Sequence, residues 1–345
     1  MSPNIPQALV KGDTIAFVSP SARINNAIPW RLERATAILE RAGYHVKIIH
    51  DPHVPHSPLS ANVAARAEEV HSAFRDPTVK AIICCIGGST ANELLPALDP
   101  EIIRNNAKIL TGGSDNTLLH HFCYVNGLRT FYGPSAINQF GEWPEPLSFT
   151  WEHFFQVTTT TQKPVGQMPR SVAFTEQVAD RKTEPERIRN GTMRARVMKP
   201  STGWRWLQSG GSEAVEGEIW GGCLPSLLQM MSTKWQVSYH EKIAFIETPK
   251  DYTLDVALCH FQDLRMRGIF EQIVGLVVGR PHGYSDADVQ GWEDGMIRAL
   301  EGYSFPVLAN VDVGHTDPVL TIPLGARVRL DQGQDLWEVL EPGVC

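Results

Sequence analysis

The stretch Lys108-Ile-Leu-Thr-Gly-Gly-Ser-Asp-Asn-Thr117 joins a short apolar run to two glycines and then to the start of an expected helix. Glycine tolerates the tight backbone of such a strand-to-helix turn, and the turn can lift a hydroxyl above the edge of a sheet. The amides at the helix start would then face negative charge that develops beside the hydroxyl. Ser114 is therefore a candidate nucleophile, although a serine before an apolar run is more often a helix N-cap.

The first 140 residues alternate between strand-like apolar runs and helix-like stretches. The expected strands cover residues 14–18, 46–49, 81–86 and 109–110, and the expected helices cover 31–42, 63–74 and a stretch from about residue 91. This alternation predicts βαβ units and a parallel sheet. Functional groups gather beyond the carboxyl ends of such strands, so Gly87-Gly88 and Gly112-Gly113-Ser114 are expected at the same edge.

The rest of the chain divides into a connector and a second α/β unit. The regular pattern dissolves from about residue 141 to 203, and a loop excursion of that length is often functional. After it, apolar runs at residues 243–246, 273–278 and 307–311 predict further strands. The expected organisation is an N-terminal domain over 1–150, a connector and substrate loop over 151–203, and a C-terminal domain over 204–345.

Composition narrows the class of protein. The chain has 345 residues, of which 42% are hydrophobic and 20% charged, as in a globular protein with room for two domains. A net charge of −7 argues against nucleic-acid polymers and anionic membranes as partners. No apolar run approaches the roughly 20 residues that span a bilayer, and the N-terminus lacks signal-peptide features, so we expect a cytoplasmic protein. Six cysteines without zinc-type spacing, and no HExxH motif, predict reduced thiols and no metal.

A nucleophilic serine needs a base, and the base is usually oriented by a carboxylate. The second unit offers both types of group at strand ends. Glu247 follows the apolar run 243–246, and His315 follows Val311-Asp-Val-Gly314. Either residue alone would be an ordinary surface group, but two of them just beyond buried strands form a more specific pattern. Their spacing cannot show that they touch.

At this point the sequence resembles a known family, the serine peptidases that include LD-carboxypeptidases and the microcin C immunity proteins. The resemblance runs from residue 12 to residue 325 and is weakest over 141–203. It is carried by motifs in the family's order: Ile86-Gly-Gly-Ser-Thr-Ala-Asn-Glu-Leu-Leu95, Gly112-Gly-Ser-Asp115, Gly221-Gly-Cys-Leu224, Gly279-Arg-Pro281 and Gly314-His-Thr-Asp-Pro318.

The resemblance implies a catalytic triad of Ser114 as nucleophile, His315 as general base and Glu247 as the orienting carboxylate. It also implies an oxyanion hole made by the backbone amides of Gly88 and Asp115, a homodimer, and no cofactor. The implied fold is α/β, with a Rossmann-like or flavodoxin-like parallel sheet in the N-terminal domain. The C-terminal domain is expected to be mixed α/β with a swivelling or barrel-like sheet.

Two departures from the family pattern bear on the substrate. Ser89 and Gly113 stand where the family commonly has aromatic residues, which removes bulk near the expected acyl pocket. Two other segments, 221–224 and 92–95, follow the microcin-immunity branch more closely than the murein branch.

Four further residues are candidates for substrate binding. Trp204 and Trp206 end the excursion, where an aromatic residue can stack on a nucleobase for about 1–3 kcal/mol, although their alternation also fits a strand with one indole in the core. Glu216 lies in a matching motif and is either a substrate contact or an ordinary loop carboxylate. Arg280 is a candidate for a substrate carboxylate, or it braces the domain interface.

The expected function is that of a cofactor-free serine hydrolase acting on a small peptide-like substrate. It would cleave an amide next to a carboxylate-bearing residue through an acyl-enzyme, most like a peptidase of aminoacyl- or peptidyl-nucleotides. The alternatives are a murein tetrapeptide LD-carboxypeptidase, a secondary-metabolism amidase on the same scaffold, and a non-catalytic ligand-binding protein.

Overall fold

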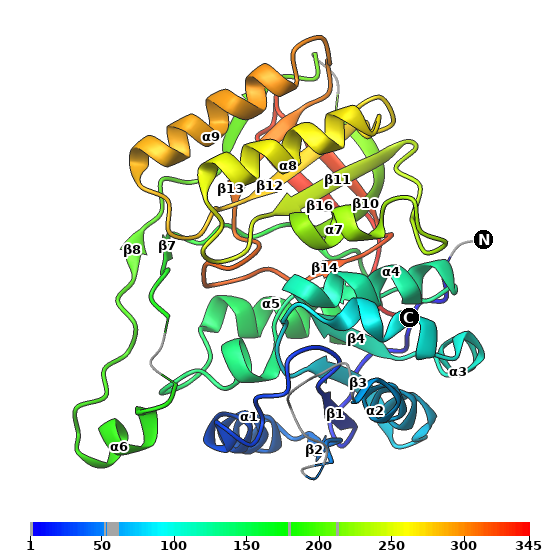
Figure 1. Cartoon of the computed structure of the whole chain (residues 1–345), viewed down its shortest axis with the longest axis vertical. Coiled ribbons are helices and arrows are strands. Elements are labelled where there is room, and N and C mark those ends of the chain that lie inside the picture. Colours follow the sequence, from blue (N-terminus) through cyan, green and yellow to red (C-terminus); the bar gives the residue numbers. More distant parts are fainter. Residues whose placement is uncertain (1–2, 52, 54–61, 179–180, 212–213) are drawn as a thin grey trace.

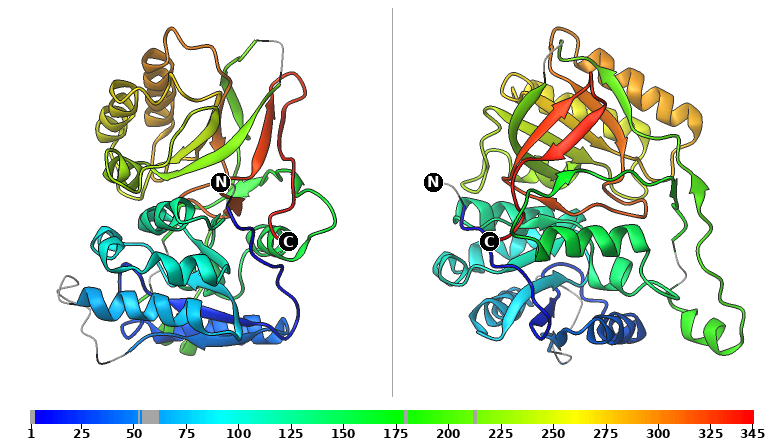
Figure 2. Two further views of the ribbon diagram at one scale, coloured as in Figure 1. Left: turned by 90° about the vertical axis from the view of Figure 1, so that its right-hand side faces the viewer. Right: turned by 180° about the vertical axis from the view of Figure 1, so that it is seen from behind.

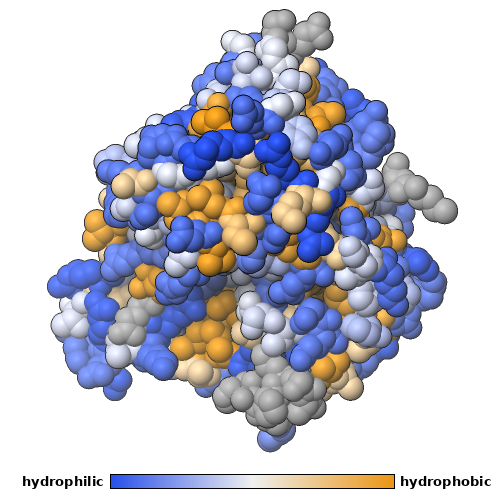
Figure 3. Space-filling view, turned by 45° about the horizontal axis from the view of Figure 1, so that its top comes forward, coloured by the Kyte–Doolittle hydropathy of each residue, from blue (hydrophilic) through white to orange (hydrophobic). Residues whose placement is uncertain are grey.

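A computed structural model describes residues 3–51, 53, 62–178, 181–211 and 214–345. Two units, each built around one sheet, are stacked along the long axis of the molecule (Figure 1). The face shown in Figure 3 is mostly hydrophilic, with apolar residues in several separate patches. None of the helices formed by the described residues combines the length and apolar character needed to cross a bilayer.

The first unit contains a six-stranded sheet in the order β14-β5-β4-β3-β1-β2. Its strands are β1 (Thr14–Val18), β2 (His45–Ile48), β3 (Val79–Cys84), β4 (Ile109–Gly112), β5 (Phe131–Tyr132) and β14 (Ile322–Pro323). The first five strands pair in parallel, which confirms the expected βαβ pattern, and their order 2-1-3-4-5 is the one seen in flavodoxin. β14 pairs antiparallel with β5, so a segment between two strands of the second unit, β13 (Val307–Val311) and β15 (Arg327–Asp331), completes the first sheet.

Helices flank this sheet (Figure 1). They are α1 (Pro29–Arg41), α2 (Val63–Arg75), α3 (Pro100–Asn105), α4 (Thr117–Val125) and α5 (Ser148–Thr159). α1 buries Leu32, Ala35 and Leu39, whose spacing forms one apolar helical face. The boundary expected at residue 150 falls inside α5.

The helix expected from about residue 91 is wrong. The structure has two 3₁₀ turns, Ala91–Glu93 and Leu95–Ala97, followed by the short helix α3. Proline lacks a backbone N–H and disfavours helical geometry in the residue before it. Pro96 and Pro100 therefore divide the segment, and Asp99 caps α3 by accepting a hydrogen bond from the Glu101 amide.

The second unit contains an eight-stranded sheet in the order β6-β16-β15-β10-β11-β12-β13-β9. Its strands are β6 (Gly166–Gln167), β9 (Arg205–Gln208), β10 (Val215–Cys223), β11 (Lys242–Glu247), β12 (Gly275–Gly279), β13 (Val307–Val311), β15 (Arg327–Asp331) and β16 (Leu336–Val339). β10 to β13 pair in parallel and the flanking strands pair antiparallel, so the sheet is mixed. All five residues of β12 and of β13 are buried, which explains why these strands are apolar apart from Asn310.

Three helices cover one face of the parallel strands, and β15 and β16 continue the same sheet away from these helices (Figure 2, left). They are α7 (Leu224–Met230), α8 (Leu254–Met266) and α9 (Asp286–Ala299). α9 begins with a capping box formed by Ser285 and Asp288. The parallel strands β11 and β13 end toward the first unit, and this brings the residues that follow them to the boundary between the two units (Figure 1).

The connector leaves the second unit as a long arm. It contains the two-stranded pair β7 (Ala173–Phe174) and β8 (Lys199–Pro200) and the short helix α6 (Glu184–Arg189), which lies at the far end of the arm (Figure 1). Glu184 is buried and pairs with Arg31 of α1, with 2.7 Å between Oε2 and Nε. The arm is therefore fastened to the first unit at its distal end.

Candidate active site

Ser114 occupies the turn between β4 and α4. It has φ +60°, a left-handed conformation that non-glycine residues rarely adopt and that is enriched at functional sites. The residues 114–116 form one 3₁₀ turn before α4, and its N-cap is Gly113, without a side-chain capping bond. The Ser114 hydroxyl contacts His315 rather than a helix amide, so the capping interpretation does not describe it.

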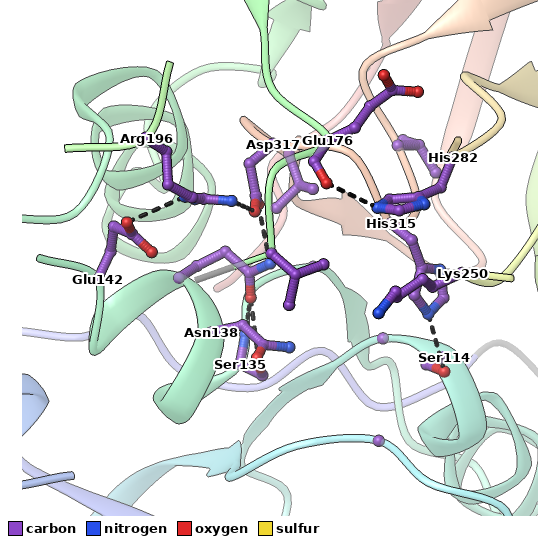
Figure 4. A pocket seen from close by; sticks show the side chains of 18 of the residues that line it. Ser114, Ser135, Asn138, Glu142, Glu176, Arg196, Lys250, His282, His315 and Asp317 are labelled. Atoms are coloured by element: carbon purple, nitrogen blue, oxygen red, sulfur yellow. Dashed lines mark hydrogen bonds and ion pairs between the residues drawn. The ribbon is translucent and has the colours of Figure 1, made fainter. Parts of the chain in front are cut away.

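The structure brings together three side chains predicted from separate strand ends. Ser114 Oγ lies 3.1 Å from His315 Nε2, and His315 Nδ1 lies 2.8 Å from Glu247 Oε2. Glu247 is the last residue of β11 and its side chain is fully buried, whereas His315 follows β13 and is 22% exposed. Figure 4 shows the His315 ring directly above Ser114. A nucleophile, a base and an orienting carboxylate have this linear arrangement in serine hydrolases.

Glu247 and His315 each stabilise the charged form of the other. Burial alone would raise the pKa of Glu247, but the His315 charge and the hydrogen bonds from His315, Tyr132 and Cys223 outweigh it, so the pKa is lowered. Burial likewise opposes the charged form of His315, yet Glu247 and, more weakly, Asp317 raise its pKa. The site therefore stabilises an imidazolium, which is the form that a base takes after removing the serine proton.

Tyr132 is a site residue that the sequence reasoning missed. Its hydroxyl accepts a hydrogen bond from the Ser114 amide at 2.8 Å and donates one to Oε1 of Glu247. Burial, followed by the nearby Glu247 charge, raises the pKa of this phenol, so the hydroxyl keeps its proton. Tyr132 thus links the backbone of the nucleophile to the carboxylate of the base pair. Its role became visible only in the structure, where Tyr132 ends β5, the strand that pairs with β4.

The loop after β3 lies against the nucleophile. A Cβ on Gly87 would lie 2.7 Å from Ser114 Cβ and 3.0 Å from its Oγ, so only glycine fits there. The carboxylate of Asp115 holds this loop in place by accepting the amides of Thr90 and Ala91, each at 2.9 Å. The hydroxyl of Ser21 donates to the same oxygen. Both expected oxyanion donors, Gly88 and Asp115, therefore belong to loops that are fixed relative to Ser114.

A pocket of about 900 Å³, part of which is open to solvent, adjoins Ser114. Ser114 and His315 lie on one side of this pocket, and polar and charged side chains that include Asn138, Glu142 and Arg196 lie on the other (Figure 4). Gly113 also lines the pocket, and a Cβ there would make only ordinary 3.5 Å contacts. Ser89 is exposed and does not line it. Gly113 therefore borders the pocket, while Ser89 lies outside it.

The two tryptophans expected to stack on a ligand also lie outside the pocket. Trp204 is buried, donates to Asp312 Oδ2 at 2.8 Å, and packs against Trp337. Trp206 lies on the edge strand β9, and its Nε1 donates to Oδ1 of Asp335 at 2.8 Å. Neither tryptophan is therefore placed to stack on a ligand in this pocket. Trp204 belongs to the core, and Trp206 forms a hydrogen bond at the surface.

Glu216 and Arg280, which were also expected to bind substrate, instead form ion pairs within the protein. Glu216 pairs with Arg327 and Arg329 on the neighbouring strand β15, at 2.9 and 2.6 Å. Arg280 is buried, pairs with Asp312 at 2.8 Å, and lies over the Phe174 ring of the connector. It therefore braces the connector against the second unit, whereas the alternative expectation placed it at the interface between the two domains.

No group of three or more histidine, cysteine or acidic side chains suited to a metal ion occurs within the described part of the chain. The described cysteines are all free thiols, four of them buried.

Known proteins resemble this chain in sequence over most of its length. The microcin C7 self-immunity protein MccF of Escherichia coli is 28% identical over 95% of this chain and 93% of its own. A Vibrio cholerae protein named as a carboxypeptidase is 31% identical over 94% of each chain. A Bacillus subtilis protein, "Probable murein peptide carboxypeptidase", is 28% identical over 98% of this chain and 95% of its own.

Solved structures show that MccF also shares the fold of this chain. The structure of MccF without ligand superposes with a TM-score of 0.89 at 27% identity, covering 99% of this chain and 100% of that one. MccF in complex with aspartyl sulfamoyl adenosine gives a TM-score of 0.88 with the same coverage and identity.

The two-domain α/β fold and these relatives define the class of protein as a serine hydrolase of the peptidase type. Residues 15–133 match the LD-carboxypeptidase N-terminal domain, and residues 216–330 match the LD-carboxypeptidase C-terminal domain. The chain belongs to the LD-carboxypeptidase family. This confirms the resemblance that the motifs carried.

Proposed function

We propose that Ser114, His315 and Glu247 are the catalytic triad and that the chain hydrolyses an amide of an aminoacyl- or peptidyl-nucleotide, next to a carboxylate-bearing residue. The observation that carries the proposal is the continuous hydrogen-bonded line from Ser114 Oγ to the buried Glu247 carboxylate, with steps of 3.1 and 2.8 Å.

The reaction follows from this line. His315 Nε2 takes the proton of Ser114 as Oγ attacks the substrate carbonyl, and the negative charge moves to the carbonyl oxygen. The amides of Gly88 and Asp115 donate to that oxygen, and each such donor contributes about 3–4 kcal/mol to a transition state of this kind. His315 then gives its proton to the leaving nitrogen, which leaves an acyl ester on Ser114. Water, deprotonated by His315, attacks the ester and restores the serine.

The nucleotide substrate is supported by the relatives. MccF, named for immunity to microcin C7, has been solved with aspartyl sulfamoyl adenosine, in which an amino acid is joined to a nucleoside. A murein peptide is the second candidate, because the relative named for that substrate covers 98% of this chain at the same 28% identity.

A paired assay tests the proposal. Purified protein is incubated with aspartyl sulfamoyl adenosine and, separately, with a murein tetrapeptide, and the products are followed by liquid chromatography and mass spectrometry. We expect release of aspartate from the first substrate and no turnover by Ser114→Ala. Cleavage of the peptide alone would reverse the ranking of substrates. Near-normal turnover by Ser114→Ala would refute the mechanism.

We also propose, on the family resemblance, that the chain is a cytoplasmic homodimer with a flavodoxin-like N-terminal domain, a connector that forms a substrate loop, and a C-terminal domain with a swivelling sheet. The 2-1-3-4-5 order supports the first domain description. A monomer mass in analytical ultracentrifugation at micromolar concentration would contradict the dimer.

A further inference from the structure

The side of the pocket away from Ser114 carries a cluster of arginines whose charges are unequally matched. Arg196 lies between two carboxylates, with Glu142 at 3.0 Å and Asp317 at 2.7 Å. Arg31 contacts Glu184 at 2.7 Å and Glu142 at 3.8 Å. The positive charge of each of these arginines is therefore neutralised inside the protein.

Arg181 differs from its neighbours. It lines the same pocket, yet within the described ranges it forms no ion pair, and its one hydrogen bond goes from Nη2 to the neutral Asn138 side chain at 2.5 Å. Its Nε is buried without a partner, as is Nη2 of Arg31, and its Nη1 donates to no described residue. Buried polar groups are nearly always paired, so an unmatched guanidinium at a pocket wall indicates a missing acceptor.

The electrostatic setting agrees with the geometry. Burial, followed by the Arg31 guanidinium, lowers the pKa of Arg181 to about 10, against the weaker pull of Asp317 and Glu142. Lys250 is a second cation on the pocket wall, but its charge is stabilised differently. Its side chain is 44% exposed and lies 3.5 Å from Asp251, so water and a carboxylate already stabilise its charge.

We infer that Arg181 binds an anionic oxygen group of the ligand, a carboxylate or a phosphoryl-type group, at the end of the pocket opposite the nucleophile. The planar guanidinium suits such groups because it can donate two parallel hydrogen bonds. Asn138, to which Arg181 donates, lies across the pocket from Ser114 and His315 (Figure 4). This inference rests on the proposed function only in taking the pocket to be the substrate site.

Two pairs of ligands distinguish whether Arg181 binds a phosphate or a carboxylate. Adenosine monophosphate and adenosine differ only in the phosphate, and a murein tetrapeptide and its C-terminal amide differ in one carboxylate. Calorimetry on Ser114→Ala protein gives a Kd for each ligand without turnover. The quantity of interest is the ratio of affinities within each pair, measured with and without Arg181→Gln.

We expect the anionic member of at least one pair to bind more tightly, and Arg181→Gln to reduce that preference about 10- to 100-fold, as for the loss of a charge-assisted hydrogen bond. Arg181→Lys should restore part of it. Lys182→Gln is the matched control, because it removes the same charge one residue away at an exposed position outside the pocket, and it should leave the ratio within twofold.

The pair that responds identifies the anion as phosphate or carboxylate. The inference is overturned if neither anionic ligand is preferred, if the preference survives Arg181→Gln, or if Lys182→Gln reduces it equally. A circular dichroism spectrum and melting temperature for each variant exclude misfolding as the cause. Because the ratios do not depend on catalysis, absence of hydrolysis with an intact Arg181 effect would remove the proposed function alone.

Discussion

Replacing Tyr132 by phenylalanine deletes one hydroxyl that joins the two halves of the candidate site. This hydroxyl accepts the Ser114 amide at 2.8 Å and donates to the buried Glu247 carboxylate. A hydrogen bond to a charged group contributes about 1.5–3 kcal/mol, and an unpaired buried amide costs about 1–3 kcal/mol. Because the two effects share one group, we expect a loss of about 2–4 kcal/mol in the free energy of unfolding.

Catalysis should suffer as well, because the strained Ser114 backbone loses a contact that holds it beside His315. A displacement of about 1 Å at a reacting group can cost about 100-fold in rate. We expect kcat to fall about 10- to 100-fold while KM changes less than about threefold.

The pH dependence distinguishes positioning from general damage. Without the hydroxyl, Glu247 keeps more of its negative charge for His315, whose pKa that charge already raises. The pKa of His315 should rise further, so the acid limb of kcat/KM should move to higher pH.

Steady-state kinetics on aspartyl sulfamoyl adenosine from pH 5 to 9, with urea unfolding, would measure all three effects. Tyr124→Phe is the matched control, since the Tyr124 hydroxyl donates to Glu218 at 2.8 Å outside the pocket. Wild-type kcat with an unmoved acid limb in Tyr132→Phe would refute the reasoning. The same kinetic changes in Tyr124→Phe would refute it equally.

Three further predictions follow from the same geometry. Gly87→Ala would bring a Cβ to within 2.7 Å of the nucleophile's Cβ, so we expect the rate of labelling by a fluorophosphonate probe to fall at least about 100-fold. Because Glu247 raises the pKa of His315 above its usual 6.5, Glu247→Gln should move the acid limb of kcat/KM to lower pH while reducing kcat, as a pH–rate profile would show. Arg280→Met should lower the free energy of unfolding by about 3–5 kcal/mol, measured with guanidinium, because it leaves the buried Asp312 carboxylate without its partner.

Much of the fold could be read from local pattern. The strands expected at residues 14–18, 81–86 and 307–311 correspond to β1, β3 (Val79–Cys84) and β13, because strands buried on both faces of a parallel sheet are mostly apolar. The helix predicted after residue 91 was wrong because Pro96 and Pro100 prevent a continuous helix. Both prolines were visible in the sequence.

The substrate-binding candidates were harder to predict. Trp204, Trp206 and Arg280 are residue types that recognise ligands and that also fill cores and bridge elements, and composition cannot separate these uses. Arg181 was overlooked for the same reason. Its unusual feature is the absence of a carboxylate partner among the described residues, which is a property of its surroundings rather than of its neighbours in sequence.

The sequence by itself determined that Ser114, Glu247 and His315 each follow a buried strand, since apolar runs, glycine turns and family motifs are local properties. Only the tertiary structure decided that these residues touch. Ser114 and His315 are 201 positions apart, and Glu247 and His315 are 68 apart, so their contacts depend on how two sheets meet. The glycine turn at Gly112-Gly113-Ser114 became a candidate nucleophile site because the second unit places a base 3.1 Å above it and Tyr132 ties its backbone to the buried carboxylate.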